Sequence, residues 1–152
     1  MKNHFLWLMT LFAMTVPKVW AGTYEWTSGW GMGVSEYSVD DGNGNELNIS
    51  CPSEDAVLND PYISAHATIM GKSYASTETG FDVIVDGVAY ENPFFTDCRA
   101  CGANFPEFWK ALRNANNLHM RAEGKTIRLP TKSIKKELRP LDEKGNTCKS
   151  AW

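Results

Sequence analysis

Short stretches in which apolar and polar residues alternate recur through the first two-thirds of this chain and constrain its fold more than any other feature. In residues 46–51 and 63–69 the apolar side chains fall at every second position, which places them on one face of a β-strand. Asp41 to Asn45 and Asp86-Gly87 provide turns between such stretches, because Asn, Asp and Gly tolerate positive φ angles. The pattern predicts antiparallel strands with one buried face and excludes a bundle of helices. The expected strands cover residues 34–40, 46–51, 63–69, 81–85, 88–90, 118–122 and 126–129.

Two helices are predicted in the second half of the chain. The apolar residues from Phe105 to Ala115 fall at helical spacing, Asn104 is a suitable N-cap, and Pro106 lies in the first turn. The second helix is expected to start at Thr131 and to be shortened by Pro140. Strands followed by late helices predict a mainly β (α+β) fold. We expect an antiparallel β-sandwich or partly open barrel of about six to eight short strands with two helices, stapled by disulfides.

The first 21 residues have the pattern of a secretory signal peptide. Lys2 and His4 precede an apolar run from Phe5 to Val16, and Val19-Trp20-Ala21 offers a small-residue cleavage site. The apolar run is too short to span a bilayer comfortably. We therefore expect cleavage near Ala21, which leaves residues 22–152 as a single disulfide-bonded, β-rich domain that is periplasmic or secreted, with no transmembrane segment.

All four cysteines follow the expected cleavage site, at Cys51, Cys98, Cys101 and Cys148. An even number of cysteines in an exported chain predicts two disulfides. Two pairings are plausible: Cys51–Cys98 with Cys101–Cys148, or Cys98–Cys101 with Cys51–Cys148. We favour the first pairing, because closing two long loops removes more entropy from the unfolded chain than closing one tight ring. The sequence alone does not decide between them.

Cys98-Arg99-Ala100-Cys101 is the motif with intrinsic chemical reactivity. A helix N-terminus next to a C-x-x-C motif stabilises a thiolate, so a thiol-disulfide oxidoreductase that uses Cys98 and Cys101 is one alternative function. The motif lacks the βαβ context of a thioredoxin-type site, and Asp97 places a negative charge beside it, which disfavours a thiolate. We expect all four cysteines to form stable structural disulfides.

Other patterns in the sequence do not indicate catalysis or a cofactor. Residues 41–46 space side-chain oxygens as a calcium loop does, but Glu46 and Pro52 stand where that loop has Gly and Glu. The two histidines of the expected mature chain, His66 and His119, are too few for a zinc site. We therefore expect a protein that is not an enzyme and has no catalytic residue, no metal and no cofactor.

Charge is distributed unevenly along the chain. Residues 22–124 contain 15 acidic and 5 basic residues, whereas residues 125–152 contain 8 basic and 3 acidic residues. The acidic balance of the expected mature chain argues against nucleic acid as a partner. The second helix has a basic face that is either solvated or a docking surface. The residues of this face are Lys132, Lys135, Lys136 and Arg139.

Two tryptophans stand among glycines close to the expected mature N-terminus. Trp26 and Trp30 lie near Gly29, Gly31 and Gly33. Aromatic residues interleaved with glycine can form an exposed recognition ribbon. We favour the alternative of an N-terminal strand whose tryptophans fill the core, and keep both tryptophans as candidate binding residues.

A resemblance to a known family starts at Gly80 and ends at Leu141. This region resembles the invasion-associated locus B family of exported bacterial proteins, which combine a β-sandwich with disulfides. The resemblance covers less than half of the expected mature chain, and the chain has only Cys51 in its first half, where the family tends to have a pair. It implies an envelope or secreted protein linked to host or surface interaction, with no catalytic residues to transfer. The features in order are Gly-Phe-Asp-Val-Ile-Val-Asp-Gly at 80–87, the pair Cys98 and Cys101, a helix at 105–115, a hairpin at 118–129 and a helix at 134–138.

Together these observations predict a non-enzymatic exported protein that acts by protein–protein recognition. Its partner would be another envelope or secreted protein, and its role that of an accessory factor in conjugation, secretion or host attachment. An inhibitor or immunity protein against a cell-wall hydrolase or toxin is the main alternative. The acidic body favours that alternative, because such hydrolases are often basic and complementary charge accelerates association.

Overall fold

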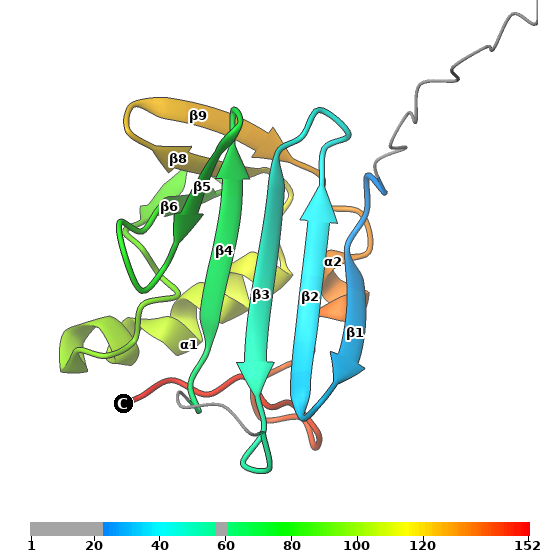
Figure 1. Ribbon diagram of the computed structural model, residues 1–152, viewed down its shortest axis with the longest axis vertical. Helices are drawn as coiled ribbons and strands as arrows, with labels where there is room; N and C mark the ends of the chain where they lie inside the picture. Colours follow the sequence, from blue (N-terminus) through cyan, green and yellow to red (C-terminus); the bar gives the residue numbers. More distant parts are fainter. Residues whose placement is uncertain (1–22, 57–60) are drawn as a thin grey trace, which may run out of the picture.

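The computed structural model describes residues 23–56 and 61–152, which form two antiparallel sheets and two helices (Figure 1). The five-stranded sheet has its strands in chain order, and the four-stranded sheet has the order β7-β6-β8-β9. The expected signal peptide and its cleavage site lie outside the described residues. The strands are β1 (Thr27–Gly31), β2 (Val34–Asp40), β3 (Glu46–Pro52), β4 (Ser64–Ile69), β5 (Lys72–Ala75), β6 (Asp82–Val85), β7 (Val88–Tyr90), β8 (Leu118–Ala122) and β9 (Lys125–Leu129), and the helices are α1 (Arg99–Arg113) and α2 (Ile134–Glu137).

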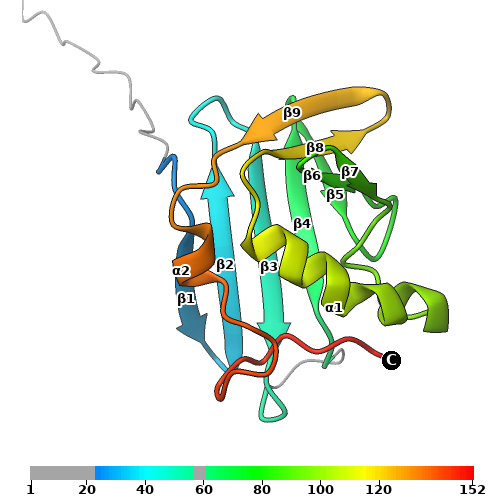
Figure 2. The same ribbon diagram turned by 180° about the vertical axis from the view of Figure 1, so that it is seen from behind.

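One face of the five-stranded sheet is covered and carries the core. Figure 2 shows α1 crossing this face, with the second sheet above it and α2 beside β1 and β2. Leu47 and Ile49 of β3 point into the core and are fully buried, as the two-residue alternation predicts. The opposite face of this sheet carries polar side chains, such as those of Glu36 on β2 and His66 on β4, which are exposed. The predicted fold class is therefore confirmed, and the described strands do not close into a barrel.

The structure has nine strands among the described residues, against the six to eight expected. The N-terminal strand that we favoured for the segment with Trp30 is present as β1, although Gly29 and Gly31 occupy alternate positions and leave no apolar alternation. β5 was not predicted, because it is only four residues long and its sequence has no clear period. A count of six to eight strands was therefore too low.

Helix α1 begins earlier than the sequence predicts. Its N-cap is Cys98, whose sulfur accepts the backbone N–H of Cys101 at 3.0 Å, and Asn104 lies inside the helix. Pro106 is also internal, where it has no N–H to donate to the carbonyl of Gly102. The Ser150 hydroxyl donates to that carbonyl at 3.3 Å, so a distant part of the chain satisfies the group that the proline leaves free.

Helix α2 is shorter than expected. It covers only Ile134–Glu137, and Ser133 before it has a left-handed φ of 65°. A helix cannot extend back through such a residue to Thr131, because helical residues require negative φ. Neither described helix has the length and apolar character needed to cross a membrane.

The disulfides are Cys51–Cys148 and Cys98–Cys101, so the pairing that we favoured is wrong. Cys98 and Cys101 lie at the start of α1 with their Cα atoms 5.0 Å apart. The Cα atoms of Cys51 and Cys148 are 4.5 Å apart. The entropy argument concerns the unfolded chain, whereas the folded backbone decides which sulfurs can meet.

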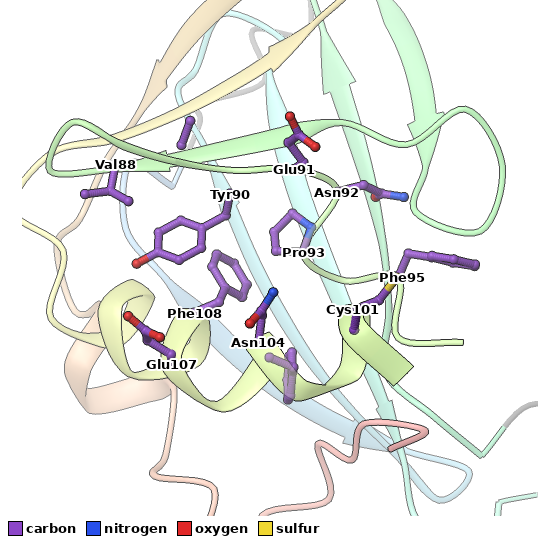
Figure 3. Close-up of a pocket in the computed structure, with 13 residues that line it drawn as sticks. Val88, Tyr90, Glu91, Asn92, Pro93, Phe95, Cys101, Asn104, Glu107 and Phe108 are labelled. Atoms are coloured by element: carbon purple, nitrogen blue, oxygen red, sulfur yellow. The ribbon is translucent and has the colours of Figure 1, made fainter. Parts of the chain in front are cut away.

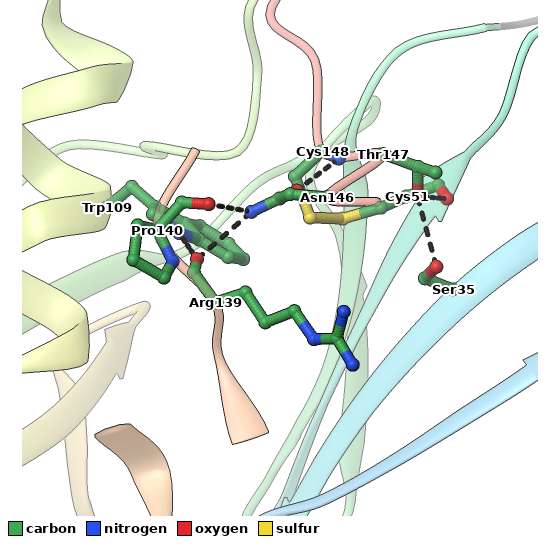
Figure 4. Close-up of a disulfide and its surroundings, with 8 residues drawn as sticks. All are labelled: Ser35, Cys51, Trp109, Arg139, Pro140, Asn146, Thr147 and Cys148. Carbon is green, nitrogen blue, oxygen red and sulfur yellow. Dashed lines mark hydrogen bonds between the residues drawn. A yellow bond between two sulfur atoms is a disulfide. The ribbon is translucent and has the colours of Figure 1, made fainter. Parts of the chain in front are cut away.

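Hydrogen bonds hold the segment around Cys148 in place (Figure 4). The Thr147 hydroxyl donates to the carbonyl of Cys51 at 2.7 Å. The side chain of Asn146 accepts the backbone N–H of Cys148 at 2.7 Å and donates to the carbonyl of Pro140 at 2.8 Å. This buried disulfide therefore attaches the last residues of the chain to the end of β3.

Candidate functional site

A groove with a volume of about 470 Å³ lies between β7, the loop that follows it, and α1 (Figure 3). Its apolar surface comes from the exposed side chain of Val88 and from aromatic rings. Tyr90 packs on Phe108 with ring centroids 5.1 Å apart, and Phe95 is half-buried nearby. Glu91 and Glu107 are exposed on its rim, and no lysine or arginine lines it. The groove therefore combines aromatic surface with negative charge.

One end of the groove is held by the turn between β6 and β7. Asp86 and Gly87 have φ angles of 49° and 88°, which form the predicted two-residue hairpin turn. The Asp86 carboxylate accepts the backbone N–H groups of Asn116 at 3.1 Å and Asn117 at 2.8 Å. These backbone hydrogen bonds lower the pKa of Asp86, and they tie the β7 wall to the residues that follow α1.

The loop that follows β7 forms one wall of the groove and is fixed by contacts with the rest of the molecule. Phe94 is fully buried, and its ring meets that of Phe108 edge to face at 5.1 Å. The Asn92 side chain donates to the carbonyl of Ser76 at 2.8 Å. Residues 91–95 are therefore fixed by contacts with Phe108 of α1 and with Ser76. Both walls of the groove, α1 on one side and β7 with its following loop on the other, are held by such contacts.

The Cys98–Cys101 disulfide closes the other end of the groove. Cys101 lines the groove and is half-buried, whereas Cys98 is exposed. A side chain at Gly102 would meet Ser150 Oγ at 2.6 Å and Trp152 Cβ at 2.8 Å. The absence of a side chain at Gly102 thus allows residues 150–152 to pack against the first turn of α1.

The tryptophans that the sequence singled out lie away from the groove. Trp26 is 1% exposed, and its indole N–H donates to the carbonyl of Pro130 at 3.0 Å. Its predicted place in the core is confirmed, and it cannot contact a partner. Trp30, on β1, is 73% exposed, so the core interpretation is wrong for this residue and the interpretation as a surface residue remains.

The basic residues near α2 are exposed, but most have acidic neighbours. Lys132 lies 2.9 Å from Glu25, whose pKa it lowers through a hydrogen bond. Lys136 lies 3.2 Å from Glu137. Arg139 pairs with Glu143 at 3.7 Å, and Lys135 is exposed. Local pairing reduces the positive charge that this segment offers to a partner.

The side chains that could bind a metal do not gather in the part of the chain that the structure describes. Within residues 23–56 and 61–152, no three His, Cys, Asp or Glu side chains gather as metal ligands would. His66 lies on β4 and His119 on β8, in different sheets.

The groove was not predicted from the sequence. The stripe of α1 that contains Phe105 and Phe108 was expected to be buried, and both are 1% exposed. The cluster of aromatic residues from Tyr90 to Phe95 was the available signal. Only the fold determines that Phe94 points into the core while Tyr90 and Phe95 line a surface groove.

Comparison with known proteins gives one match. The sequence profile of the YfjT family matches residues 24–138, a range that includes both sheets and both helices. No curated protein and no solved structure matches the chain. The resemblance to the invasion-associated locus B family stays a prediction. Because the matched residues make up well over half of the sequence, the chain belongs to the YfjT family.

Proposed function

We propose that this protein is an exported, non-enzymatic recognition protein of the bacterial envelope, and that it binds another protein through the groove between β7 and α1. The observation that carries the proposal is the groove itself, an aromatic surface with an acidic rim on two supported walls. Its volume of about 470 Å³ falls in the range of about 300–1,000 Å³ typical of small-molecule sites, so it has room for a few side chains of a bound segment and not for a folded surface. The two disulfides are compatible with an oxidising compartment.

The chemistry of the groove defines the class of segment that fits it. Tyr90 and Phe95 provide partly exposed aromatic surface for an apolar or aromatic side chain. Glu91 and Glu107 add negative charge to the rim, which favours a segment that carries Lys or Arg. The ligand would be a loop or tail of an envelope or secreted protein with an aromatic residue next to basic ones.

Two biological roles use such a site. An accessory factor in conjugation, secretion or host attachment would hold a partner within an envelope assembly. An inhibitor or immunity protein would instead cover a cell-wall hydrolase or toxin. The acidic rim at Glu91 and Glu107 is the observation that favours this second candidate, because many such hydrolases are basic.

A photocrosslinking experiment tests the site. Val88 lines the groove and is 56% exposed, so p-benzoylphenylalanine at this position would lie next to a bound segment. His66, exposed on the opposite face of the five-stranded sheet, is the matched control position. After irradiation of cells that export the protein, we expect a defined protein adduct from position 88 and none from position 66. Equal adducts from both positions would contradict the proposal.

Charge reversal on the rim separates specific binding from chance contact. We expect Glu91→Lys combined with Glu107→Lys to lower the adduct yield by up to about tenfold, since rim charges act mainly on the association rate. Glu36→Lys, at an exposed position on β2, is the control and should leave the yield unchanged. An unchanged yield in the double variant would exclude a basic segment as the ligand.

An alternative of a different class is a thiol-disulfide oxidoreductase. The observation in its favour is that Cys98 is exposed and caps the N-terminus of α1, a position that stabilises a thiolate. In a graded glutathione buffer, followed by alkylation and peptide mapping, we expect both disulfides to persist, as structural ones do below about −300 mV. Reduction of Cys98–Cys101 near the potential of disulfide isomerases, together with insulin reductase activity, would instead establish the enzyme.

A further inference from the structure

β7 is an edge strand of the four-stranded sheet. It pairs with β6 on one side and with no other described strand. Its three residues, Val-Ala-Tyr, include no charge and no proline, so only its short length discourages another strand from pairing with it. Ala89, in the middle of β7, is exposed.

The lining of the groove shows that the groove runs along this edge. Val88, Ala89 and Tyr90 all line it, although successive side chains of a strand point to opposite faces of a sheet. A groove on one face alone would be lined by Val88 and Tyr90 and not by Ala89. Figure 3 shows the Tyr90 ring pointing toward Phe108 on α1. The groove is therefore bounded by the edge of β7 on one side and by a helix on the other.

The register of the β6–β7 hairpin identifies the backbone groups on the open side. Asp86-Gly87 joins Val85 to Val88 as a two-residue turn, and the residues that flank such a turn exchange hydrogen bonds. Bonded and non-bonded pairs alternate from there, so Val88 and Tyr90 bond to β6 while Ala89 directs its N–H and C=O outward. Among the described residues, no backbone group bonds to these two groups of Ala89.

The neighbouring hairpin requires the same alternation. In β8–β9, Ala122 and Lys125 flank a two-residue turn and exchange hydrogen bonds. Counted from there, His119 bonds to β6 instead of to β9, and its partner on β6 is Ile84. Ile84 therefore directs its backbone groups to β8, which leaves those of Ala89, opposite it on β7, without a bond.

We propose that the segment bound in the groove is extended and pairs with β7 as an additional strand, with its main-chain hydrogen bonds to Ala89. This inference rests on the proposed function and adds the conformation of the ligand to it. An added strand takes affinity from main-chain bonds and specificity from pockets for its alternate side chains. Asn92 has a φ of 35°, which ends the extended edge. Because the edge is short, α1 supplies the contact area that three residues of strand lack.

The alternation of an added strand assigns its side chains to two environments. Residues on either side of the one paired with Ala89 point to the same face as Tyr90, and so toward α1 and Glu107. The residues between them point the other way, as Glu91 does in Figure 3. No lysine or arginine lines the groove, so positive charge on the ligand meets no like charge there. The ligand is therefore a strand with an aromatic residue that points toward α1 and basic residues next to it that reach Glu91.

Proline at position 89 tests the pairing. Ala89→Pro removes the outward N–H without touching the bonds between β6 and β7, and an edge strand tolerates proline at such a position. Ala89→Ser keeps the N–H and is one control. Thr126→Pro is the other, because Thr126 is also the second residue after a two-residue turn, on the opposite edge of the same sheet.

The readout is the photocrosslinked adduct from the α1 wall. Asn104 is exposed there and lines the groove, so p-benzoylphenylalanine at this position probes the ligand away from the altered edge. In cells that export the protein, we expect the wild-type edge and both controls to give the same adduct. Ala89→Pro should lower the adduct yield by about tenfold, because it leaves a carbonyl of the ligand unpaired. An unchanged yield in an Ala89→Pro protein with an unchanged circular dichroism spectrum would overturn strand pairing and leave the proposed function standing. No adduct from either position 88 or position 104 would overturn both.

Mapping the adducts tests the extended conformation without altering the edge. p-Benzoylphenylalanine at position 104 contacts side chains of the ligand that point toward α1, whereas the same residue at position 91 contacts those that point away. Peptide mapping should place the two adducts within one short segment of the partner, at residues an odd number of positions apart. Adducts at the same residue, at an even separation or in remote segments would overturn the proposal, whether or not Ala89→Pro folds.

Discussion

Trp109→Ala is expected to lower the free energy of unfolding by about 3–5 kcal/mol, the loss typical of a large aromatic residue removed from a core. Trp109 is 1% exposed at the centre of the covered face. Its ring contacts Tyr37 of β2 with a centroid distance of 6.0 Å and Phe105 with one of 5.7 Å. Its indole N–H donates to the carbonyl of Arg139 at 2.8 Å. The substitution therefore leaves a cavity and removes one of the two hydrogen bonds to the Arg139 carbonyl, which also accepts from the Asn146 side chain at 3.0 Å.

Chemical denaturation followed by circular dichroism measures this loss. Trp30→Ala is the matched control, because it removes the same side chain from a position that is 73% exposed. The control should differ from wild type by no more than about 0.5 kcal/mol. Similar losses in the two variants would mean that α1 does not pack against β2 as described.

Removal of the Cys51–Cys148 disulfide is expected to cost about 4–5 kcal/mol of stability. The bond joins residues 97 positions apart, and the loss of unfolded-state entropy on closing a loop of this length corresponds to about 4.7 kcal/mol in the chain-entropy treatment. Cys51 is fully buried and Cys148 is 6% exposed, so alanine at both positions is compatible with the surrounding core.

The second disulfide supplies the comparison. Cys98–Cys101 spans only three positions, and the same treatment assigns such a short loop about 2 kcal/mol. We therefore expect the Cys98→Ala, Cys101→Ala double variant to unfold at a clearly higher denaturant concentration than the Cys51→Ala, Cys148→Ala double variant. The reverse order would contradict the loop-length explanation.

Local patterns in the sequence predicted those elements in which the polarity of each side chain matches its burial. β3 was predicted because Leu47, Ile49 and Cys51 alternate with polar residues, and all three are fully buried. The burial of Trp109 followed from helical spacing in the same way. In each case the period of the backbone determines which side chains turn toward the core, so neighbouring residues contain the information.

Features that depend on distant residues could not be predicted. The tolerance of Pro106 inside α1 involves the Ser150 hydroxyl, which donates to the carbonyl of Gly102 from 48 positions away. The groove depends on Asp86 holding the segment after α1. β1 has glycines instead of an apolar period, so the bounds of this expected strand and the exposure of Trp30 follow only from its pairing with β2. These contacts exist only once the chain has folded.

The connectivity of the cysteines has a consequence for how the protein matures. A chain that enters an oxidising compartment from its N-terminal end exposes Cys51 together with Cys98 and Cys101 before Cys148 arrives. Oxidation in order of arrival joins Cys51 to Cys98, and that bond is absent from the folded protein. Where that bond forms, thiol–disulfide exchange must transfer Cys51 to its late partner. If the chain is exported as proposed, a disulfide isomerase in addition to an oxidase would then raise the yield of the folded protein.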